Sequence, residues 1–279
     1  MNTIIKKEFL SENVFRMTVE APRIAQSRKA GHFVIIRIGE GGERIPLTIA
    51  DADTECGTIT LIVQIMGCTS AKMSKLNVGD TIADIVGPLG NATHIEKVGT
   101  VLCAGGGVGI APLYPIVQAL KRAGNRIVTV LAARTADLLI LHREMAEFSD
   151  EMIVMTDDGS RGKKGLVTAG MEKAIEREKI DQAVVVGPAV MMKFAALTTK
   201  KYNIPTIASL NTIMVDGTGM CGACRCSVGD KTKFVCVDGP EFDAHQINFD
   251  EMIQRLGAYK NEETAAYQQY TTSLQDEKH

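Results

Sequence analysis

Four cysteines stand close together in the segment DGTGMCGACRCSVGDKTKFVCVDG, residues 216–239: Cys221, Cys224, Cys226 and Cys236. Four thiolates complete a tetrahedral metal site, so a structural zinc ion is one interpretation, and free thiols are another. A third interpretation follows from the spacing. It leaves one cysteine out of the ligand set and replaces it with a residue of another type.

The cysteine spacing resembles that of plant-type [2Fe–2S] sites, which use C-x4-C-x2-C followed by a distant fourth cysteine. The residue five positions before Cys221 is Asp216, so the chain reads D-x4-C-x2-C-x11-C and ends at Cys236. Cys226 falls between the spaced positions, and we expect an extended CRCSV segment to point its side chain away. An iron–sulfur cluster held by Asp216, Cys221, Cys224 and Cys236 is favoured over zinc. Aspartate is a harder oxygen ligand whose protonation would couple ligation to pH.

A glycine run follows an apolar segment at TVLCAGGGVGIAP, residues 100–112. Glycine lets the backbone turn sharply and approach a pyrophosphate, whose charge then lies at the positive end of the following helix. The strict dinucleotide fingerprint would need glycine at position 110, where this chain has Ile110. A tight turn without any ligand would use the same residues. The glycines that we select as nucleotide-binding candidates are Gly105, Gly106, Gly107 and Gly109.

Two further segments end predicted strands in a similar way. VVVGPAVMM places Gly187 and Pro188 before a helix, which is also a simple way to start a helix. TDDGSRG places Asp157 after a strand, where a carboxylate can accept hydrogen bonds from a ribose, although Asp-Gly pairs are common in turns.

The N-terminal half carries its own polar motifs. In RIPLTIA, residues 44–50, Arg44 can pair with a phosphate and Thr48 can hydrogen-bond a heterocycle, although an exposed arginine at a strand start needs no ligand. GCTS, residues 67–70, offers two hydroxyl groups and backbone amides at a helix start.

The order of elements predicts two main folding units. Residues 1–97 contain short β-branched runs closed by Gly, Pro or Asp, typical of a small antiparallel barrel, with one helix at 70–76. Residues 98–208 alternate between strands and helices, including one helix over 136–149, as in a doubly wound parallel sheet. The cysteine segment, 209–247, follows as a small loop domain, and the polar tail, 248–279, is predicted to be helical.

Composition limits the class of protein. The 279 residues carry a net charge of -2 and are 45% hydrophobic and 23% charged, as in a soluble globular protein. These values give no reason to expect nucleic-acid or membrane binding, and no segment has the length and apolarity of a membrane span. Seven cysteines, four of them clustered, indicate metal ligation in a reducing compartment, so we expect a cytoplasmic protein.

Taken in order, these motifs resemble those of the ferredoxin–NADP reductase superfamily. The chain contains RIPLTI, GCTS, GPLGN, GGGVGIAP, AART, TDDGSRG, VGPAVMM and then the cysteine segment. The resemblance covers the chain up to about residue 245. It implies an FAD-binding barrel, an NAD-binding α/β domain and a C-terminal [2Fe–2S] domain.

The resemblance also implies roles for individual residues. Thr48 would lie at the flavin ring as the one catalytic residue, through a hydrogen bond to flavin N5, and Arg44 would lie near the pyrophosphate. The remaining flavin contacts would be Pro46, Leu47, Gly67, Thr69 and Ser70. The pyridine-nucleotide contacts would be Gly105, Gly106, Gly107, Gly109, Arg134, Asp157, Gly187 and Pro188.

Two branches of the superfamily carry such a cysteine segment: electron-transfer subunits of dihydroorotate dehydrogenase, and small subunits of NADH-dependent reduced ferredoxin:NADP oxidoreductase. The first branch has cysteine at the position of Asp216, so the chain resembles the second. That resemblance implies a heterodimer with a larger iron–sulfur flavoprotein subunit, contact with ferredoxin through that subunit, and electron bifurcation. The sequence alone leaves NADH and NADPH open, and the family favours NADH. A non-catalytic module that senses redox state through its cluster is an interpretation of a different class.

Overall fold

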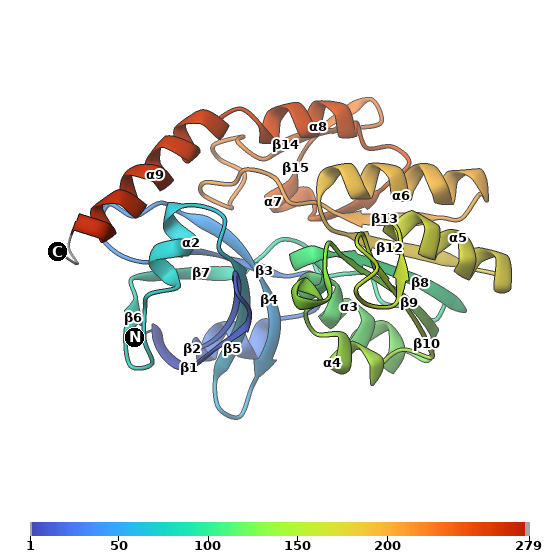
Figure 1. Cartoon of the computed structure of the whole chain (residues 1–279), viewed down its shortest axis with the longest axis horizontal. Coiled ribbons are helices and arrows are strands. Elements are labelled where there is room, and N and C mark those ends of the chain that lie inside the picture. The colour runs from blue at the N-terminus through green and yellow to red at the C-terminus, as the bar shows by residue number, and fades with distance from the viewer. Residues whose placement is uncertain (1, 277–279) are drawn as a thin grey trace.

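The computed structural model describes residues 2–276, with side chains described through residue 273. Its first sheet has seven strands in the order β6-β1-β2-β5-β4-β3-β7, which curl into a nearly closed antiparallel barrel (Figure 1). Alternate residues point inward and form an apolar core around Phe15, Met17 and Leu61, which are fully buried. The strands are β1 (Asn2–Ser11), β2 (Val14–Glu20), β3 (Phe33–Arg37), β4 (Ile45–Asp53), β5 (Thr58–Gln64), β6 (Thr81–Ile82) and β7 (Asp84–Leu89).

Two short helices accompany the barrel, α1 (Pro22–Ser27) and α2 (Cys68–Met73). The sequence predicts α2 at 70–76, which starts two residues too late. Ser70 does not precede the helix but lies in its first turn, where its Oγ accepts hydrogen bonds from the amides of Met66 and Gly67, at 3.0 and 3.1 Å. The Ser70 side chain therefore accepts a hydrogen bond from the N-cap residue, Gly67, which precedes it in the chain.

The second sheet has the order β11-β10-β9-β8-β12-β13-β16 and is parallel except for β16 at one edge. Successive residues of β8 face opposite sides, so Val101 and Cys103 pack with α3 while Leu102 and Ala104 pack in the core with α5 and α6. The strands are β8 (Thr100–Gly106), β9 (Arg126–Ala133), β10 (Glu151–Thr156), β11 (Lys163–Lys164), β12 (Gln182–Val186), β13 (Thr206–Ser209) and β16 (Glu241–Asp243). The helices are α3 (Ile110–Arg122), α5 (Val167–Arg177) and α6 (Ala189–Lys201).

The single helix predicted over 136–149 is wrong. The chain forms a 3₁₀ turn, Ala136–Leu138, and a short helix, α4 (His142–Ala146), separated at Leu141, whose φ is 53°. Leu139, Ile140 and Leu141 are all buried. Three consecutive residues of an α-helix span about 200° around its axis, so an irregular backbone is required to bury all three against one sheet.

The C-terminal part is attached to both sheets. It contains the hairpin β14 (Arg225–Val228) and β15 (Lys231–Phe234), then α7 (Val235–Asp238), α8 (Phe249–Leu256) and α9 (Lys260–Asp276). β16 pairs with β13, while α9 reaches back to the barrel, where Lys72 Nζ lies 5.4 Å from the ring centre of Tyr270 (Figure 1). The tail is helical as predicted, and its last residues, 277–279, lie outside the described residues. The domain limits at 97, 208 and 247 stay predictions. No helix within 2–276 is long and apolar enough to cross a membrane.

One buried asparagine anchors the connection between barrel and sheet. Asn125 is 3% exposed, and its Oδ1 accepts hydrogen bonds from the amides of Val98 and Gly99, at 2.8 and 3.1 Å. Its Nδ2 donates to the carbonyl oxygens of Glu96 and Leu120, at 2.8 and 2.9 Å. One side chain thus hydrogen-bonds four backbone groups, three in residues 96–99 and one at Leu120, and these two segments do not pair as strands.

We expect Asn125→Ala to lower the free energy of unfolding by about 3 kcal/mol, because buried backbone groups lose their partners. The midpoint of urea unfolding, followed by circular dichroism, measures this change. Asn261→Ala, at an exposed position of α9, is the matched control and should change the midpoint little. Equal midpoints for the two variants would contradict the role of Asn125.

Candidate functional site

The glycine run lies at the carboxyl end of β8 and in the 3₁₀ turn Gly107–Gly109 that follows it. A Cβ on Gly109 would lie 2.6 Å from Gly187 Cα, and a Cβ on Gly106 would lie 2.2 Å from Met191 Sδ. Gly105 lies under α3, where a Cβ would meet Leu113. Gly109 is thus required by the close approach of the backbones after β8 and β12, whereas Gly105 and Gly106 make room for side chains of α3 and α6.

Gly107 differs from the other glycines of the run. Its φ is 56°, and no atom lies within 4 Å of the position where a Cβ would be. The turn therefore leaves a free approach at this residue, at the N-terminal end of α3. Of Gly105, Gly106, Gly107 and Gly109, only Gly107 has surroundings that leave room for a ligand.

The predicted nucleotide contacts lie at the carboxyl ends of four neighbouring strands. Arg134 follows β9 and Asp157 follows β10, whereas the glycine run and Gly187 follow β8 and β12. The loops are joined by backbone hydrogen bonds from the amides of Asp157 and Asp158 to the carbonyls of Ala133 and Arg134, at 3.1 and 3.3 Å. This edge of a parallel sheet is where ligands of such folds bind.

The barrel motif lies on β4 and just before it. Arg44 is exposed, whereas Thr48 is partly buried and faces Phe33 of β3 in the antiparallel ladder. Thr69 Oγ1 donates a hydrogen bond to the carboxylate of Glu43, which ties the start of α2 to the residue before Arg44. The structure thus brings Arg44 and the 67–70 segment together, through a glutamate that no sequence motif identified.

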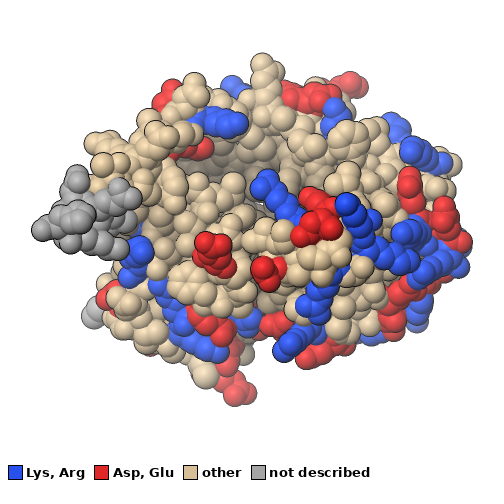
Figure 2. Space-filling model, in the orientation of Figure 1, with Lys and Arg blue, Asp and Glu red and all other residues tan. Residues whose placement is uncertain are grey.

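The two predicted cofactor motifs face each other. α3 packs against β4, and the 3₁₀ turn of the glycine run packs against β5. Figure 2 shows a hollow between the barrel and the parallel sheet, below the edge formed by α8 and α9. A molecule in this hollow would touch residues of both sheets.

The predicted cluster ligands form two pairs. Cys224 and Cys236 are each 2% exposed, and their Sγ atoms lie 3.3 Å apart, too far for a disulfide bond. Asp216 Oδ2 accepts a hydrogen bond from the amide of Cys221 at 2.8 Å, and its Oδ1 accepts one from the amide of Thr218. Among the side chains described, those of residues 2–273, no three His, Cys, Asp or Glu are already gathered around one point as metal ligands.

The protonation states of the two pairs differ. Burial raises the pKa of the Cys236 thiol to about 12, and the neighbouring Cys224 contributes to the shift. The hydrogen bonds from the backbone amides of Thr218 and Cys221 lower the pKa of Asp216, which keeps its carboxylate charged. The buried thiols would release protons on binding a metal ion, whereas Asp216 is already an anion.

Cys226 lies in β14 and is 1% exposed. If the CRCSV segment were extended throughout, Cys224 and Cys226 would lie on the same face, because alternate residues of a strand share a face. The strand begins only at Arg225, so extended geometry does not place Cys226 away from Cys224. Burial raises the pKa of the Cys226 thiol to about 11. Its exclusion from the ligand set stays a prediction that depends on spacing.

The cluster segment packs directly on the barrel. A Cβ on Gly217 would lie 2.7 Å from Leu89 Cδ1 and 2.8 Å from Ile35 Cγ1. In the ladder, Phe33 faces Leu89 on one side and Thr48 on the other. Because neighbouring strands are about 4.8 Å apart, only about 10 Å of sheet separates Thr48 from Leu89, which touches the cluster segment.

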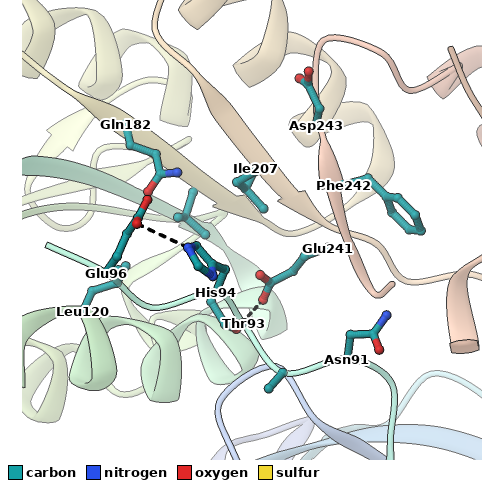
Figure 3. Close-up of a pocket in the computed structure, with 12 residues that line it drawn as sticks. Asn91, Thr93, His94, Glu96, Leu120, Gln182, Ile207, Glu241, Phe242 and Asp243 are labelled. Carbon is teal, nitrogen blue, oxygen red and sulfur yellow. Dashed lines mark hydrogen bonds and ion pairs between the residues drawn. The ribbon is translucent and has the colours of Figure 1, made fainter. Parts of the chain in front are cut away.

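A groove of about 270 Å³ lies at the opposite end of the parallel sheet from the predicted nucleotide contacts (Figure 3). Thr93 Oγ1 donates to Glu241 Oε1 at 2.5 Å, and burial raises the pKa of this glutamate. Beside it, the amide of Asn91 donates to the carbonyl of Gly239 at 2.7 Å, and Asn91 Nδ2 to that of Val237 at 3.1 Å. These hydrogen bonds hold residues 237–241, which follow Cys236, against residues 91–93, which follow the last barrel strand, β7.

Comparison with known proteins agrees with this architecture. Residues 211–248 match the iron-sulfur cluster binding domain of dihydroorotate dehydrogenase B, and residues 104–196 match the oxidoreductase NAD-binding domain. The chain is 49% identical over 270 residues to the dihydroorotate dehydrogenase B (NAD(+)) electron transfer subunit homolog of Thermotoga maritima. The aligned region covers 97% of this chain and 95% of that protein. It is 32% identical over 255 residues to the electron transfer subunit of Bacillus caldolyticus, covering 88% and 96%.

The chain belongs to the family of dihydroorotate dehydrogenase B electron-transfer subunits. This electron-transfer subunit is also similar to a chain of the NADH-dependent reduced ferredoxin-NADP oxidoreductase structure, with 48% identity, a TM-score of 0.93, and coverage of 97% of this chain and 98% of that one. A Neisseria gonorrhoeae ferredoxin NADP+ reductase, at 17% identity and a TM-score of 0.57, covers 72% of this chain and 89% of its own and shares the fold. The resemblance to the ferredoxin–NADP reductase superfamily is confirmed. The chain is an NAD(H)-dependent oxidoreductase subunit with an iron–sulfur binding domain.

We expect Gly217→Ala to displace the cluster segment of this electron-transfer subunit from the barrel, because its Cβ would collide with Leu89 and Ile35. Gly222→Ala is a matched control in the same segment. Its φ of 66° resembles the 74° of Gly217, but the nearest atom to its Cβ would be 3.6 Å away. Iron content per chain after purification should fall at least about threefold further for Gly217→Ala, as a loss of about 1 kcal/mol beyond backbone strain implies. Equal iron content in both variants would contradict the packing argument.

Proposed function

We propose that the chain passes electrons between NAD(H), FAD and a [2Fe–2S] cluster to a larger iron–sulfur flavoprotein subunit. The observation that carries the proposal is the short path across the barrel from Thr48 on β4 through Phe33 to Leu89, which touches Gly217. When bound, FAD accepts a hydride from NADH and releases electrons singly, and the cluster passes them on one at a time.

The residues at the edge of the parallel sheet would hold the nicotinamide nucleotide. Gly107 allows the pyrophosphate to approach the N-terminal end of α3, and Gly187 and Pro188 form the neighbouring edge of β12. Arg134 and Asp157 are exposed at the ends of β9 and β10, which are one and two strands away from the strand that carries the glycine run. Asp157 would accept from ribose hydroxyl groups, which supports NADH.

The barrel residues would hold the flavin. Thr48 would hydrogen-bond the ring at N5, with Pro46 and Leu47 beside it on β4, and Arg44 would pair with the pyrophosphate. Gly67 would admit the second phosphate contact, because no atom lies within 4 Å of the position of its Cβ. Ser70 fixes the turn through its bonds to Gly67, and Thr69 fixes it through Glu43.

The donor set on the cluster segment suits iron. Asp216 is tied to Cys221 through that residue's backbone amide, and the thiols of Cys224 and Cys236 lie side by side. Two pairs of donors match the two metal ions of a [2Fe–2S] cluster. Positive φ angles at Gly217, Gly219 and Gly222 let the chain curve tightly between the ligands.

Two observations favour a ferredoxin:NADP oxidoreductase over a dihydroorotate dehydrogenase complex. Asp216 stands where the dihydroorotate branch has cysteine, and the chain is 48% identical to the ferredoxin-NADP oxidoreductase chain but only 32% identical to the dihydroorotate dehydrogenase B subunit of Bacillus caldolyticus. That structure is described as one of flavin-based electron bifurcation. We infer that this chain delivers electrons to a partner subunit that carries out bifurcation, and that ferredoxin would bind to that partner. The alternative, an electron-transfer subunit for dihydroorotate oxidation, is supported by the names of the relatives.

The purified chain should show flavin and iron–sulfur absorbance that NADH bleaches anaerobically, with NADPH at least tenfold less efficient. A colourless chain, or a coloured one reduced by dithionite but not by NADH, would sink the proposal. Gly109→Ala should lose the NADH response and keep the dithionite response, because its Cβ would lie 2.6 Å from Gly187. Gly39→Ala, with no atom within 4 Å, is the matched control.

Replacing Asp216 tests the ligand set. Asp216→Cys should keep the cluster and shift its midpoint potential on the order of 100 mV toward negative values, because thiolate stabilises oxidised iron more than carboxylate does. The measurement is a redox titration followed by electron paramagnetic resonance. Asp230→Ala, at an exposed position in the turn between β14 and β15, is the control. If Asp216→Ala leaves spectrum and potential unchanged while Cys226→Ala loses the cluster, Cys226 is the ligand.

A further inference from the structure

Two arginines bind the carbonyl groups between two of the predicted cluster ligands. Arg255 Nη2 donates to the carbonyl oxygen of Ala223 at 3.1 Å, and Arg225 Nη1 donates to that of Gly222 at 3.2 Å. Gly222 and Ala223 are the only residues between Cys221 and Cys224. Both peptide carbonyls of this short turn are therefore held by guanidinium groups, one from β14 and one from α8.

Arg255 stands on a well-anchored helix. Asn248 Oδ1 caps α8 by accepting from the amide of Glu251 at 3.1 Å, and Met252 is 2% exposed in the core. Lys193 Nζ on α6 pairs with Asp250 Oδ1 at 2.5 Å. Because α8 is fixed at its start and along its buried face, the position of the Arg255 guanidinium is fixed relative to the cluster segment.

The charges of both arginines are uncompensated at short range. Among the side chains of residues 2–273, no carboxylate oxygen lies within 4.0 Å of the Arg225 or Arg255 side chain. Arg255 is partly buried and Arg225 is exposed, so water screens the charge of Arg255 less.

We propose that Arg255, with Arg225 in support, is a positioning residue that orients the Cys221–Cys224 turn and raises the reduction potential of the cluster. This inference rests on the proposed function. Reduction adds one electron to the cluster, and a nearby positive charge stabilises the added negative charge. A trans peptide directs its C=O and N–H to opposite sides. Holding both carbonyls toward the arginines therefore turns the amides of Ala223 and Cys224 to the opposite side of the turn.

The test compares Arg255→Gln, Arg255→Lys and Arg225→Gln in the intact chain. Redox titration followed by electron paramagnetic resonance gives the cluster midpoint potential, and iron analysis gives its occupancy. Arg255→Gln should shift the reduction equilibrium about tenfold toward the oxidised cluster, which is about 59 mV for one electron. Arg255→Lys, which keeps the charge, should recover at least half of the shift, and Arg225→Gln should shift less because it is exposed.

Arg177→Gln is the control for removing one charge, because Arg177 is exposed on α5 and paired with Glu151. It should leave the potential unchanged. A fully loaded Arg255→Gln with the wild-type potential would overturn the inference. If Arg255→Gln does not bind the cluster, the other two variants decide. Cluster binding by Arg255→Lys together with a lower potential in Arg225→Gln supports the inference. Loss of the cluster from Arg255→Lys, or an unchanged potential in Arg225→Gln, overturns it. A wild-type chain without a cluster overturns the proposed function instead.

Discussion

The contact between Gly217 and the outer residues of β3 and β7 is the constraint on which the rest of the arrangement depends. Only a residue without a side chain fits between the cluster segment and Leu89 at this distance, and only glycine adopts its φ of 74° readily. The contact brings the third unit of the chain against the first. The parallel sheet lies beside both, because β16 pairs with β13 and α3 packs on β4. The sites predicted for three different chemical groups therefore lie along one surface.

The glycine-rich edge of the parallel sheet follows the same physical rule. Gly109 and Gly187 lie backbone to backbone because β8 and β12 are neighbours in the sheet while 78 positions apart in the chain (187 minus 109). Close approach of main chains leaves donor groups near a ligand and excludes side chains that would cover them. Met191 covers Gly106 and Gly187, so the turn is closed on one side and open at Gly107.

Much of the fold could be predicted from the sequence, because hydrophobic periodicity and turn residues are local signals. The barrel, the α/β alternation and the helical tail follow from them. The broken helix at 136–149 could not, because the burial of Leu139, Ile140 and Leu141 depends on a sheet formed by distant residues. Spacing selected Asp216 and the glycines. Glu43, Thr93 and Arg255 carry no local signal, because each acts on a group that is remote in sequence, and the GPLGN motif gives no indication that Asn91 binds the segment after Cys236.

The bonds of Asn91 and Thr93 to the segment after Cys236 have a mechanical consequence. Barrel, parallel sheet and cluster segment each touch the other two, so their contacts form a closed ring, which α9 reinforces by returning to α2. In a closed ring, no two units can swing apart as a simple hinge without breaking a contact of the third. Entry and release of a nucleotide would then use the loops at the strand ends, while the distance between the predicted flavin and cluster sites would stay constant.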